Sequence, residues 1–410
     1  MTAPTLAVPF NPLAPEQREN PFDILAAARR EQPVFYVPAL KLWVVTRYDD
    51  VLAVLKDHET FSSTGALKSD STPVPKEVAA ILAEGFRGMP YIIEVDPPQH
   101  DRIRGLVTKG FTPRRIASLE PAIWRIVDEL LAPLPPTGEI DVIGAFAWPL
   151  PLRVLGELLG LPRGDLAQLH VWGNDWILVQ QEGPLEKRLA HARGTVALQH
   201  YFLDAVRRRE REPTDDLIGA LVAARNHIDP PLTDLEIAGL PLDLMVAGHV
   251  TVTRAIGSAL NLLFSCPHLR DHLLDPEQAP RAIEEILRLE SPAQGLFRTA
   301  MRDTEIGGIA IPAGARIMAH FASANRDACV FVEADTFDPD RPDLARHIAF
   351  GKGIHFCIGA PLARLELGIA LPALLARLPG LRAGGGPRVR EPAFFARGFA
   401  ELHVAWGREK

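Results

Sequence analysis

The sequence predicts a mainly α-helical protein with small, peripheral β-sheets. Three observations support this class. Long segments carry apolar residues at helical spacing, the strand-like segments are short, and 37 prolines divide the chain into many helices with irregular joints. Helices are expected over residues 121–134, 185–211, 234–266, 280–289 and 361–378.

The strand-like segments are expected to form hairpins. Residues 34–36 should pair with residues 42–46, and residues 304–311 should fold back on themselves at Gly307-Gly308. A further strand is expected over residues 401–406.

The composition excludes several classes of protein. The 410 residues are 47% hydrophobic and 23% charged, which is ordinary for a soluble globular protein and excludes a disordered chain, a coiled coil and a collagen-like fibre. The 44 basic and 51 acidic residues give a net charge of 44 − 51 = −7. This charge argues against non-specific binding of nucleic acid, which needs dense positive charge.

The sequence also predicts where the protein resides. Its first residues lack the basic region and the apolar run of a signal peptide. The most apolar stretch, residues 237–263, contains Asp243, His249 and Arg254, so no membrane span is expected. Three widely spaced cysteines do not form a disulfide framework and favour a reducing compartment. We therefore expect a cytoplasmic protein without a membrane anchor.

One cysteine lies in a glycine-rich segment directly before a predicted helix. Gly351 and Gly353 precede Cys357, Gly359 follows it, and the helix of residues 361–378 comes next. The positive end of a helix dipole and its free N–H groups stabilise a thiolate, which is both a nucleophile and a metal ligand. The alternatives are a small buried apolar cysteine, or a nucleophile paired with the histidine two residues before it.

The same segment carries a resemblance. In its Phe-x-x-Gly-x-His-x-Cys-x-Gly pattern, the run Phe350-Gly351-Lys352-Gly353-Ile354-His355-Phe356-Cys357-Ile358-Gly359 resembles the haem-binding signature of the cytochrome P450 family. The resemblance implies the cytochrome P450 fold, with haem b (iron protoporphyrin IX) between the long central helix and the helix after the cysteine loop. It also implies that Cys357 ligates the iron and that Phe350, Gly351 and Gly359 contact the haem.

Two further motifs extend the resemblance along the chain. Glu285-Ile286-Leu287-Arg288 resembles the family's Glu-x-x-Arg, and Arg341 occupies the place of the arginine that joins this pair. A buried acid between two arginines is costly to break and would fix the geometry behind the cysteine loop. An isolated pair of this kind would instead be a surface ion pair.

The resemblance also implies which residues bind the haem propionates. His100 and Arg104 lie four residues apart and share one helical face. Arg298 and His355 match two further propionate ligands of the family. Because the resemblance covers the whole chain, residues 1–410 are expected to be a single haem domain without a fused reductase, β-richer at about residues 30–60 and with a helical core at about residues 97–380.

The oxygen side is expected within the long helix. Ala247-Gly248-His249-Val250-Thr251 resembles the family's oxygen-binding motif, which makes Ala247, Gly248 and Thr251 the expected catalytic residues. The alternative is an ordinary packed helix. The chain departs from the family at Val250, where an acid normally relays protons. Either Thr251 with ordered water suffices, or the enzyme works better with peroxide.

Asp243 is an unexpected carboxylate in an apolar stretch. It is seven residues before Val250, so both lie on nearly the same helical stripe. Three interpretations stay open: a structural aspartate, a contact for a basic or hydroxylated substrate, and a substitute proton relay.

The segment 62–94 is long and shows no periodic pattern, so it is expected to be a loop that forms a lid or pocket wall. The resemblance implies a pocket for an apolar substrate of small to moderate size. Besides Asp243, its expected lining residues are Phe86, Met89, Ala293, Leu296, Phe297, Phe394 and Phe395.

The resemblance implies a haem-thiolate monooxygenase that takes electrons from NAD(P)H through a ferredoxin reductase and a small acidic ferredoxin. A basic surface for that ferredoxin is expected to include Arg102, Lys109, Arg114, Arg115, Lys352 and Arg364. The alternatives are a peroxide-driven or rearranging haem-thiolate enzyme and a non-catalytic haem sensor. A monomer is expected, and the sequence does not identify the substrate.

Overall fold

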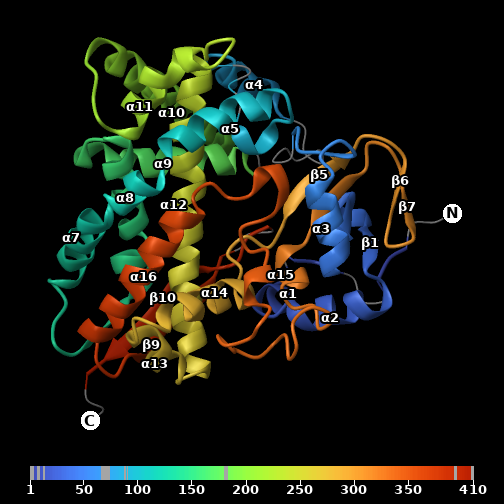
Figure 1. The fold of residues 1–410 in the computed structure, drawn as a ribbon, viewed down its shortest axis with the longest axis vertical. Helices are drawn as coiled ribbons and strands as arrows, with labels where there is room; N and C mark the ends of the chain where they lie inside the picture. The colour runs from blue at the N-terminus through green and yellow to red at the C-terminus, as the bar shows by residue number, and fades with distance from the viewer. Residues whose placement is uncertain are drawn as a thin grey trace. The chain divides into compact units, whose positions relative to one another are not determined.

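The computed structural model of the protein describes residues 4–6, 10–12, 14–65, 74–86, 89, 91–179, 183–391 and 395–407. It confirms the mainly α-helical class with small β-sheets (Figure 1). The chain divides into two compact units, and each is described by itself. Unit 1 comprises Met1–Ala66, Val127–Leu150 and Thr251–Lys410, and unit 2 comprises Leu67–Ile126 and Pro151–Val250. That the two units form one haem domain stays a prediction.

The main sheet of unit 1 has five strands in the order β1-β2-β8-β5-β3. The predicted hairpin near residue 40 is confirmed, because the first two strands pair antiparallel with Val34 opposite Val45. Aliphatic and aromatic side chains on both faces of this sheet pack into two buried clusters. The strands are β1 (Val34–Val37), β2 (Leu42–Val45), β3 (Phe61–Ser62), β5 (Leu296–Ala300) and β8 (Arg316–Ala319).

Two smaller sheets complete the β-structure of unit 1. β6 (Thr304–Ile306) and β7 (Ile309–Ile311) form the predicted hairpin, and its turn residues Gly307 and Gly308 both have positive φ angles, of 56° and 81°. The other sheet has the order β4-β10-β9 and includes the predicted C-terminal strand. Its strands are β4 (Gly138–Asp141), β9 (Arg382–Arg390) and β10 (Phe399–Trp406).

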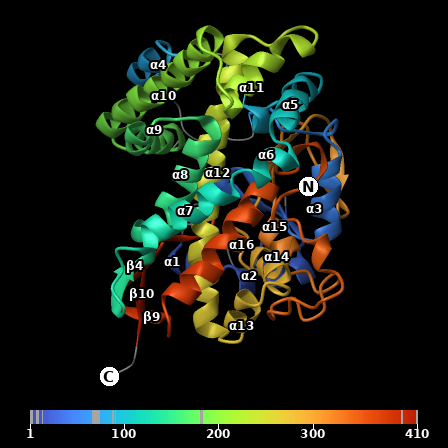
Figure 2. The same ribbon diagram turned by 60° about the vertical axis from the view of Figure 1, so that its left-hand side comes forward.

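The helices of unit 1 confirm two of the predicted segments to within one residue. These are α14 (Ala279–Leu289) and α16 (Ala360–Arg377), which lie side by side in Figure 2. Both helices carry a proline in the first turn, where its missing N–H costs nothing. The others are α1 (Pro15–Glu19), α2 (Phe22–Glu31), α3 (Tyr48–Lys56), α13 (Leu269–Leu274) and α15 (Phe321–Ala324).

Unit 2 is built around the 27-residue helix α10 (Leu185–Arg211), which has the predicted bounds and packs on α9 and α4 (Figure 1). Buried Val78, Val179 and Ala192 form the contact. The other helices are α4 (Lys76–Leu82), α5 (Gln99–Gly110), α6 (Pro113–Ala117), α9 (Leu166–Leu178) and α11 (Leu217–Ala224). Three helices run from one unit into the other: α7 (Glu120–Leu131), α8 (Pro149–Leu159) and α12 (Asp234–Ser265).

The expectation that residues 62–94 form a loop without regular structure is wrong. This segment contains α4 and a short 3-10 helix, Ile92–Glu94. The reason for the error is that α4 has seven residues and buries a single side chain, Val78, so it leaves almost no periodic signal.

The long helix α12 has the predicted extent. It is long and apolar enough, by length and composition alone, to cross a membrane, with a mean hydropathy of 1.4 over its most apolar window. However, 56% of that window is buried inside the protein. The core helix of a globular protein passes the same test, and the burial of residues such as Ile237, Met245 and Ile256 agrees with that role.

Candidate active site

The cysteine loop leads directly into α16. Gly351 and Gly353 have φ angles of 69° and 74°, in the left-handed region that favours glycine. The Cys357 amide donates to the carbonyl of Phe350 at 2.9 Å, and the amide of Ala360 donates to the Cys357 carbonyl at 3.4 Å. Cys357 therefore lies three residues before the first residue of an 18-residue helix, as predicted. The free N–H groups and the dipole of that helix favour a thiolate.

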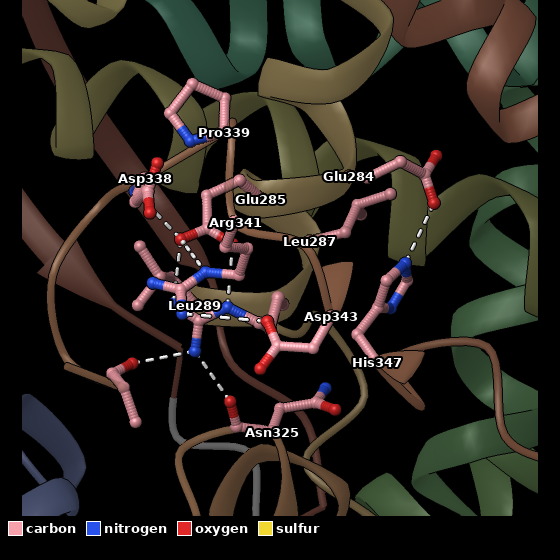
Figure 3. Close-up of polar contacts among 12 residues, drawn as sticks. Glu284, Glu285, Leu287, Leu289, Asn325, Asp338, Pro339, Arg341, Asp343 and His347 are labelled. Atoms are coloured by element: carbon pink, nitrogen blue, oxygen red, sulfur yellow. Dashed lines mark hydrogen bonds and ion pairs between the residues drawn. The ribbon is translucent and has the colours of Figure 1, made fainter. Parts of the chain in front are cut away.

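The predicted group of one acid and two arginines is confirmed (Figure 3). Glu285 is fully buried and accepts hydrogen bonds from Arg288 Nε at 2.7 Å and from Arg341 Nε at 3.0 Å. Arg288 also donates to the carbonyls of Asn325 and Ala334, both at 2.7 Å. We call Glu285, Arg288 and Arg341 the buried ion triad. It joins α14 to the segments before the cysteine loop, so it is structural rather than a solvated surface pair.

A second polar group beside the triad was missed from the sequence. Glu284 Oε2 lies 2.8 Å from His347 Nε2 (Figure 3). Glu284 also accepts a hydrogen bond of 2.6 Å from Arg364 Nε of α16. Burial alone would raise the pKa of Glu284, but the hydrogen bonds from Arg364 and His347 outweigh burial and lower it to about 2. Arg364 also stacks on the ring of Phe350, 4.5 Å from its centroid. The adjacent glutamates 284 and 285 were the only signal available in the sequence.

The four predicted propionate ligands lie on a strand, a 3-10 helix and an α-helix. Arg298 is buried in β5 and donates to the Phe297 carbonyl at 2.7 Å, and His355 ends a 3-10 helix in the cysteine loop. In unit 2, His100 and Arg104 lie on α5, and His100 Nδ1 is 2.9 Å from Asp101 Oδ1. The joint role of these four residues stays a prediction.

The donor set nevertheless fits a haem. Two arginines and two histidines are donors that suit carboxylate groups. A thiolate at a helix N-terminus is a soft ligand that suits iron. A Cβ atom at Gly359 would lie 3.8 Å from Cys357 Sγ, an ordinary van der Waals contact, so the haem contact of Gly359 stays a prediction.

The expected oxygen-binding residues lie on an uninterrupted part of α12, which is helical through Ala247, Gly248 and Thr251. Gly248 approaches the neighbouring α8 closely, since a Cβ atom there would lie 3.4 Å from Leu155. Beyond Thr251, the buried hydroxyl of Thr253 donates to the Ala147 carbonyl at 3.1 Å.

Asp243 has a structural partner. Its Oδ2 atom accepts a hydrogen bond of 2.7 Å from the Ile92 amide. Burial raises the pKa of Asp243 well above its usual range, the bond from Ile92 lowers it, and the nearby Glu94 raises it further. The carboxyl group thus anchors the segment that precedes α5. This supports the structural interpretation and leaves the other two open.

The predicted pocket wall of unit 2 is tied to three helices. The Phe86 amide donates to Gln199 of α10 at 3.0 Å, and the Tyr91 hydroxyl accepts from Trp176 Nε1 of α9 at 3.0 Å. Met89 is buried. With the bond from Ile92 to α12, these contacts give the segment a defined position within the unit.

The expected pocket residues of unit 1 divide into two groups. Ala293 pairs with Ala396, and Leu296 lies on the same face of β5 as Arg298. Phe297 points to the other face and packs into the N-terminal core beside Phe395, with ring centroids 6.3 Å apart. Strand alternation assigns Phe297 to this core, and its expected place in the pocket lining stays a prediction. Phe394 lies outside the described residues.

Three of the six cations expected on the ferredoxin surface are already ion-paired. Arg102 pairs with Glu236 at 3.0 Å and Arg115 with Asp215 at 3.5 Å. Arg364 is held by Glu284, as described above. Each acid weakens the positive potential that its arginine offers to a partner.

Glu366 is a buried acid that the sequence analysis did not single out. It lies on α16 and is 1% exposed, and its Oε2 atom has no hydrogen-bond partner among the described residues. Burial raises its pKa well above the usual range for glutamate, so the folded protein holds it as the neutral acid.

Replacing Glu366 by Gln is expected to flatten the dependence of stability on pH. A raised folded-state pKa gives stability that is fully present below the unfolded pKa of 4.5 and is lost as pH rises toward the folded pKa. The stability of Glu366→Gln relative to the native protein should therefore rise by up to about 1.4 kcal/mol per pH unit above pH 5. Denaturant unfolding at pH 5, 6, 7 and 8 measures this, with the exposed Glu305→Gln as control. Parallel curves for Glu366→Gln and the native protein would contradict it.

Known proteins with similar sequences and structures belong to one family. The sequence profile described as Cytochrome P450 matches residues 279–379, which include the ion triad and the cysteine loop. Mycinamicin IV hydroxylase/epoxidase of Micromonospora griseorubida is 38% identical over 370 residues, 89% of each chain. Vitamin D(3) 25-hydroxylase of Pseudonocardia autotrophica is 35% identical over 95% of this chain and 94% of its own. The solved structure of cytochrome P450 CYP109Q5 from Chondromyces apiculatus has a TM-score of 0.87 at 37% identity, covering 98% and 99% of the two chains.

These similarities extend over nearly the whole sequence and include the cysteine loop. The chain belongs to the cytochrome P450 family, whose members carry a haem iron. Within that family it is a monooxygenase, in agreement with the hydroxylases among its relatives.

Proposed function

We propose that this cytochrome P450 binds haem b with the Cys357 thiolate as iron ligand and inserts one oxygen atom of O2 into an apolar organic substrate. The observation that supports this most directly is the position of Cys357, held by the Phe350 carbonyl three residues before α16. The buried ion triad behind the loop supports a rigid ligand geometry.

The proposed reaction converts R–H, O2, two electrons and two protons into R–OH and water. Haem supplies the activation of O2 when bound. The chain's own residues would hold the haem in place and pass protons to the oxygen side. His100, Arg104, Arg298 and His355 would bind the propionates, and the Thr251 hydroxyl would pass protons on the oxygen side beside Ala247 and Gly248.

For the substrate, we propose an apolar compound of small to moderate size. The named relatives act on mycinamicin IV and on vitamin D(3), which supports an apolar pocket without selecting a compound. Among the residues that the structure describes, we propose that the substrate pocket is lined by Asp243, Phe86, Met89, Ala293, Leu296 and Phe395.

Asp243 gives this proposal a specific test. Replacing it by Asn keeps an oxygen that accepts from Ile92 but removes the carboxyl group that can carry a negative charge. If Asp243 contacts a basic substrate, amine binding should weaken about 10-fold to 100-fold, the value of a charged hydrogen bond. Spectral titration with an amine and its neutral hydrocarbon analogue measures this, and the analogue is the control. Equal affinities of both proteins for the amine would exclude a contact between Asp243 and a basic substrate.

For the electrons, we propose NAD(P)H, a ferredoxin reductase and a small acidic ferredoxin. Among the six cations expected to attract the ferredoxin, Lys109 and Arg114 are exposed in unit 2, and Lys352 lies over the ring of Phe356 in unit 1. We propose that these three attract the ferredoxin most strongly, because the other three are paired with acids. We further propose a cytoplasmic monomer.

Titration of the purified ferric protein with terpenes, steroids, fatty acids, aromatic acids and amines tests the proposed function. A Soret shift to the high-spin form identifies a bound chemotype, and product analysis with reductase and ferredoxin then tests oxidation. A colourless protein, or a bound compound that is never oxidised under any reductant, would contradict the proposal. The second outcome would favour a haem sensor.

A peroxide-driven or rearranging enzyme is the second candidate, and one observation favours it. Val250 has no proton to give, whereas hydrogen peroxide brings both its electrons and its protons, as R–H and H2O2 give R–OH and water. A high yield of product per reducing equivalent with ferredoxin would reject this candidate.

A further inference from the structure

A pair of histidines beside Val250 has no role in the function proposed so far. His170 of α9 and His249 of α12 lie in unit 2 with their ring centroids 5.3 Å apart and their planes at 76°. His249 is 3% exposed, whereas His170 is partly exposed. The pair therefore joins a partly exposed residue of α9 to a buried residue of α12.

A small pocket connects this pair to Val250. It encloses about 10 Å³, close to the minimum for one water molecule. Its polar side chains come from three residues, His170, Asn174 and His249, and Val250 forms part of the same wall. The remaining lining is apolar or glycine, so polar contacts in the pocket are concentrated on the two imidazoles and one amide.

The contacts of His170 suit proton transfer. Asn174 Nδ2 lies 2.9 Å from His170 Nε2, and an amide nitrogen can only donate, so Nε2 accepts and the ring proton is on Nδ1. Burial lowers the pKa of His170 to about 4, which keeps the ring neutral near pH 7. A neutral imidazole offers one donor and one acceptor, so once the Asn174 amide releases Nε2, the ring can accept a proton there and release the one on Nδ1.

The proposed reaction requires two protons for each O2 reduced, and they must reach the Thr251 region of α12. Two titratable side chains lie in the eight residues before Thr251, Asp243 and His249. Asp243 Oδ2 is engaged by the Ile92 amide, whereas His249 adjoins Val250 and the pocket. His249 is therefore the better-placed carrier.

We propose that His170, His249 and the pocket beside Val250 form a histidine relay that delivers protons to the oxygen side of this enzyme. His170 takes a proton from solvent, and His249 receives it. Water beside Val250 then carries it to the hydroxyl of Thr251, the next residue of α12. Each histidine returns to its neutral state, so the relay consumes only solvent protons. The inference rests on the proposed function and names the residues that supply its protons.

The relay first predicts a spectroscopic property of the resting chain. In the diamagnetic ferrous carbon monoxide complex, the 15N shifts of the two imidazoles report which nitrogen carries each proton. We expect a single tautomer for His170 and a change in the tautomer or N–H exchange rate of His249 when His170 is replaced by Leu. Unchanged His249 signals in His170→Leu would overturn the coupling between the rings.

The relay also predicts a difference between two oxidants. Thioanisole sulfoxidation serves as the probe, driven either by O2 with NADPH, reductase and ferredoxin or by hydrogen peroxide. In His249→Leu, the sulfoxide formed per O2 consumed should fall at least 5-fold, whereas the peroxide-driven rate should stay within 2-fold. The exposed His227→Leu is the matched control and should match the native protein in both assays.

A rescue variant separates proton transfer from packing. Adding Val250→Asp to His249→Leu places a carboxylate in the wall of the same pocket and should restore at least half of the lost yield per O2. Unchanged yield in His249→Leu, or an equal loss with both oxidants, would overturn the relay. Absence of sulfoxide from the native protein with either oxidant would instead contradict the proposed function itself.

Discussion

Replacing Cys357 by Ser is expected to lower the rate of substrate oxidation by roughly 100-fold or more, because the hydroxyl cannot supply an anionic sulfur to the iron. The loop itself should survive, since the contact that closes it uses the Cys357 amide and the Phe350 carbonyl rather than the side chain. Turnover with reductase and ferredoxin measures the effect, and the absorption spectrum of the ferrous carbon monoxide complex reports the changed ligand.

The other two cysteines provide the controls. Cys266 and Cys329 are free, and neither lies near a glycine-rich turn or before a long helix. Cys266→Ser and Cys329→Ser should therefore keep the native spectrum and rate. Native-like spectrum and turnover in Cys357→Ser would show that another residue ligates the iron.

Replacing Glu285 by Gln is expected to destabilise the protein by about 3–5 kcal/mol, the cost of leaving buried charges uncompensated. The substitution keeps the size of the side chain but removes the charge that holds both Arg288 and Arg341. Because Arg288 also holds two backbone carbonyls, we expect the haem to be released more easily too. Denaturant unfolding and the transfer of haem to a competing apoprotein measure the two effects.

A matched acid lies in the same segment as Arg341. Asp340 is exposed and lies 3.9 Å from Arg281, which is itself half exposed. Asp340→Asn should therefore cost less than about 1 kcal/mol, as surface ion pairs do. If Glu285→Gln and Asp340→Asn lose similar stability, the buried ion triad does not stabilise the fold more than a surface ion pair does.

Several parts of the fold could be predicted because their signals are local. The 27 residues of α10 show helical spacing throughout, and the paired glycines at 307 and 308 specify a hairpin turn. The strand β9 could not be predicted in this way. Its sequence contains three consecutive glycines and a proline, which have low strand propensity, and pairing with β10 is what holds it extended.

The site shows the same division. Cys357 and Glu285 could be predicted from motifs, since their neighbours in sequence carry the pattern. The partners of Glu284 could not, because His347 and Arg364 lie 63 and 80 residues away. The packing of α14 against α16 brings in Arg364, and its packing against the 3-10 helix Leu344–Arg346 brings in His347. Strand alternation, which decides that Phe297 belongs to the core, was likewise invisible without the bounds of β5.

The close contact between the cysteine loop and α3 affects how the protein is assembled. A Cβ atom at Gly353 would lie 2.3 Å from the carbonyl oxygen of Leu55, so the loop rests directly on backbone made about 300 residues earlier. The Tyr48 hydroxyl donates to the Arg346 carbonyl at 2.7 Å and reinforces the contact. During synthesis, α3 leaves the ribosome long before the cysteine does. The cysteine loop thus reaches its final shape only when the last quarter of the chain settles on a surface provided by the first.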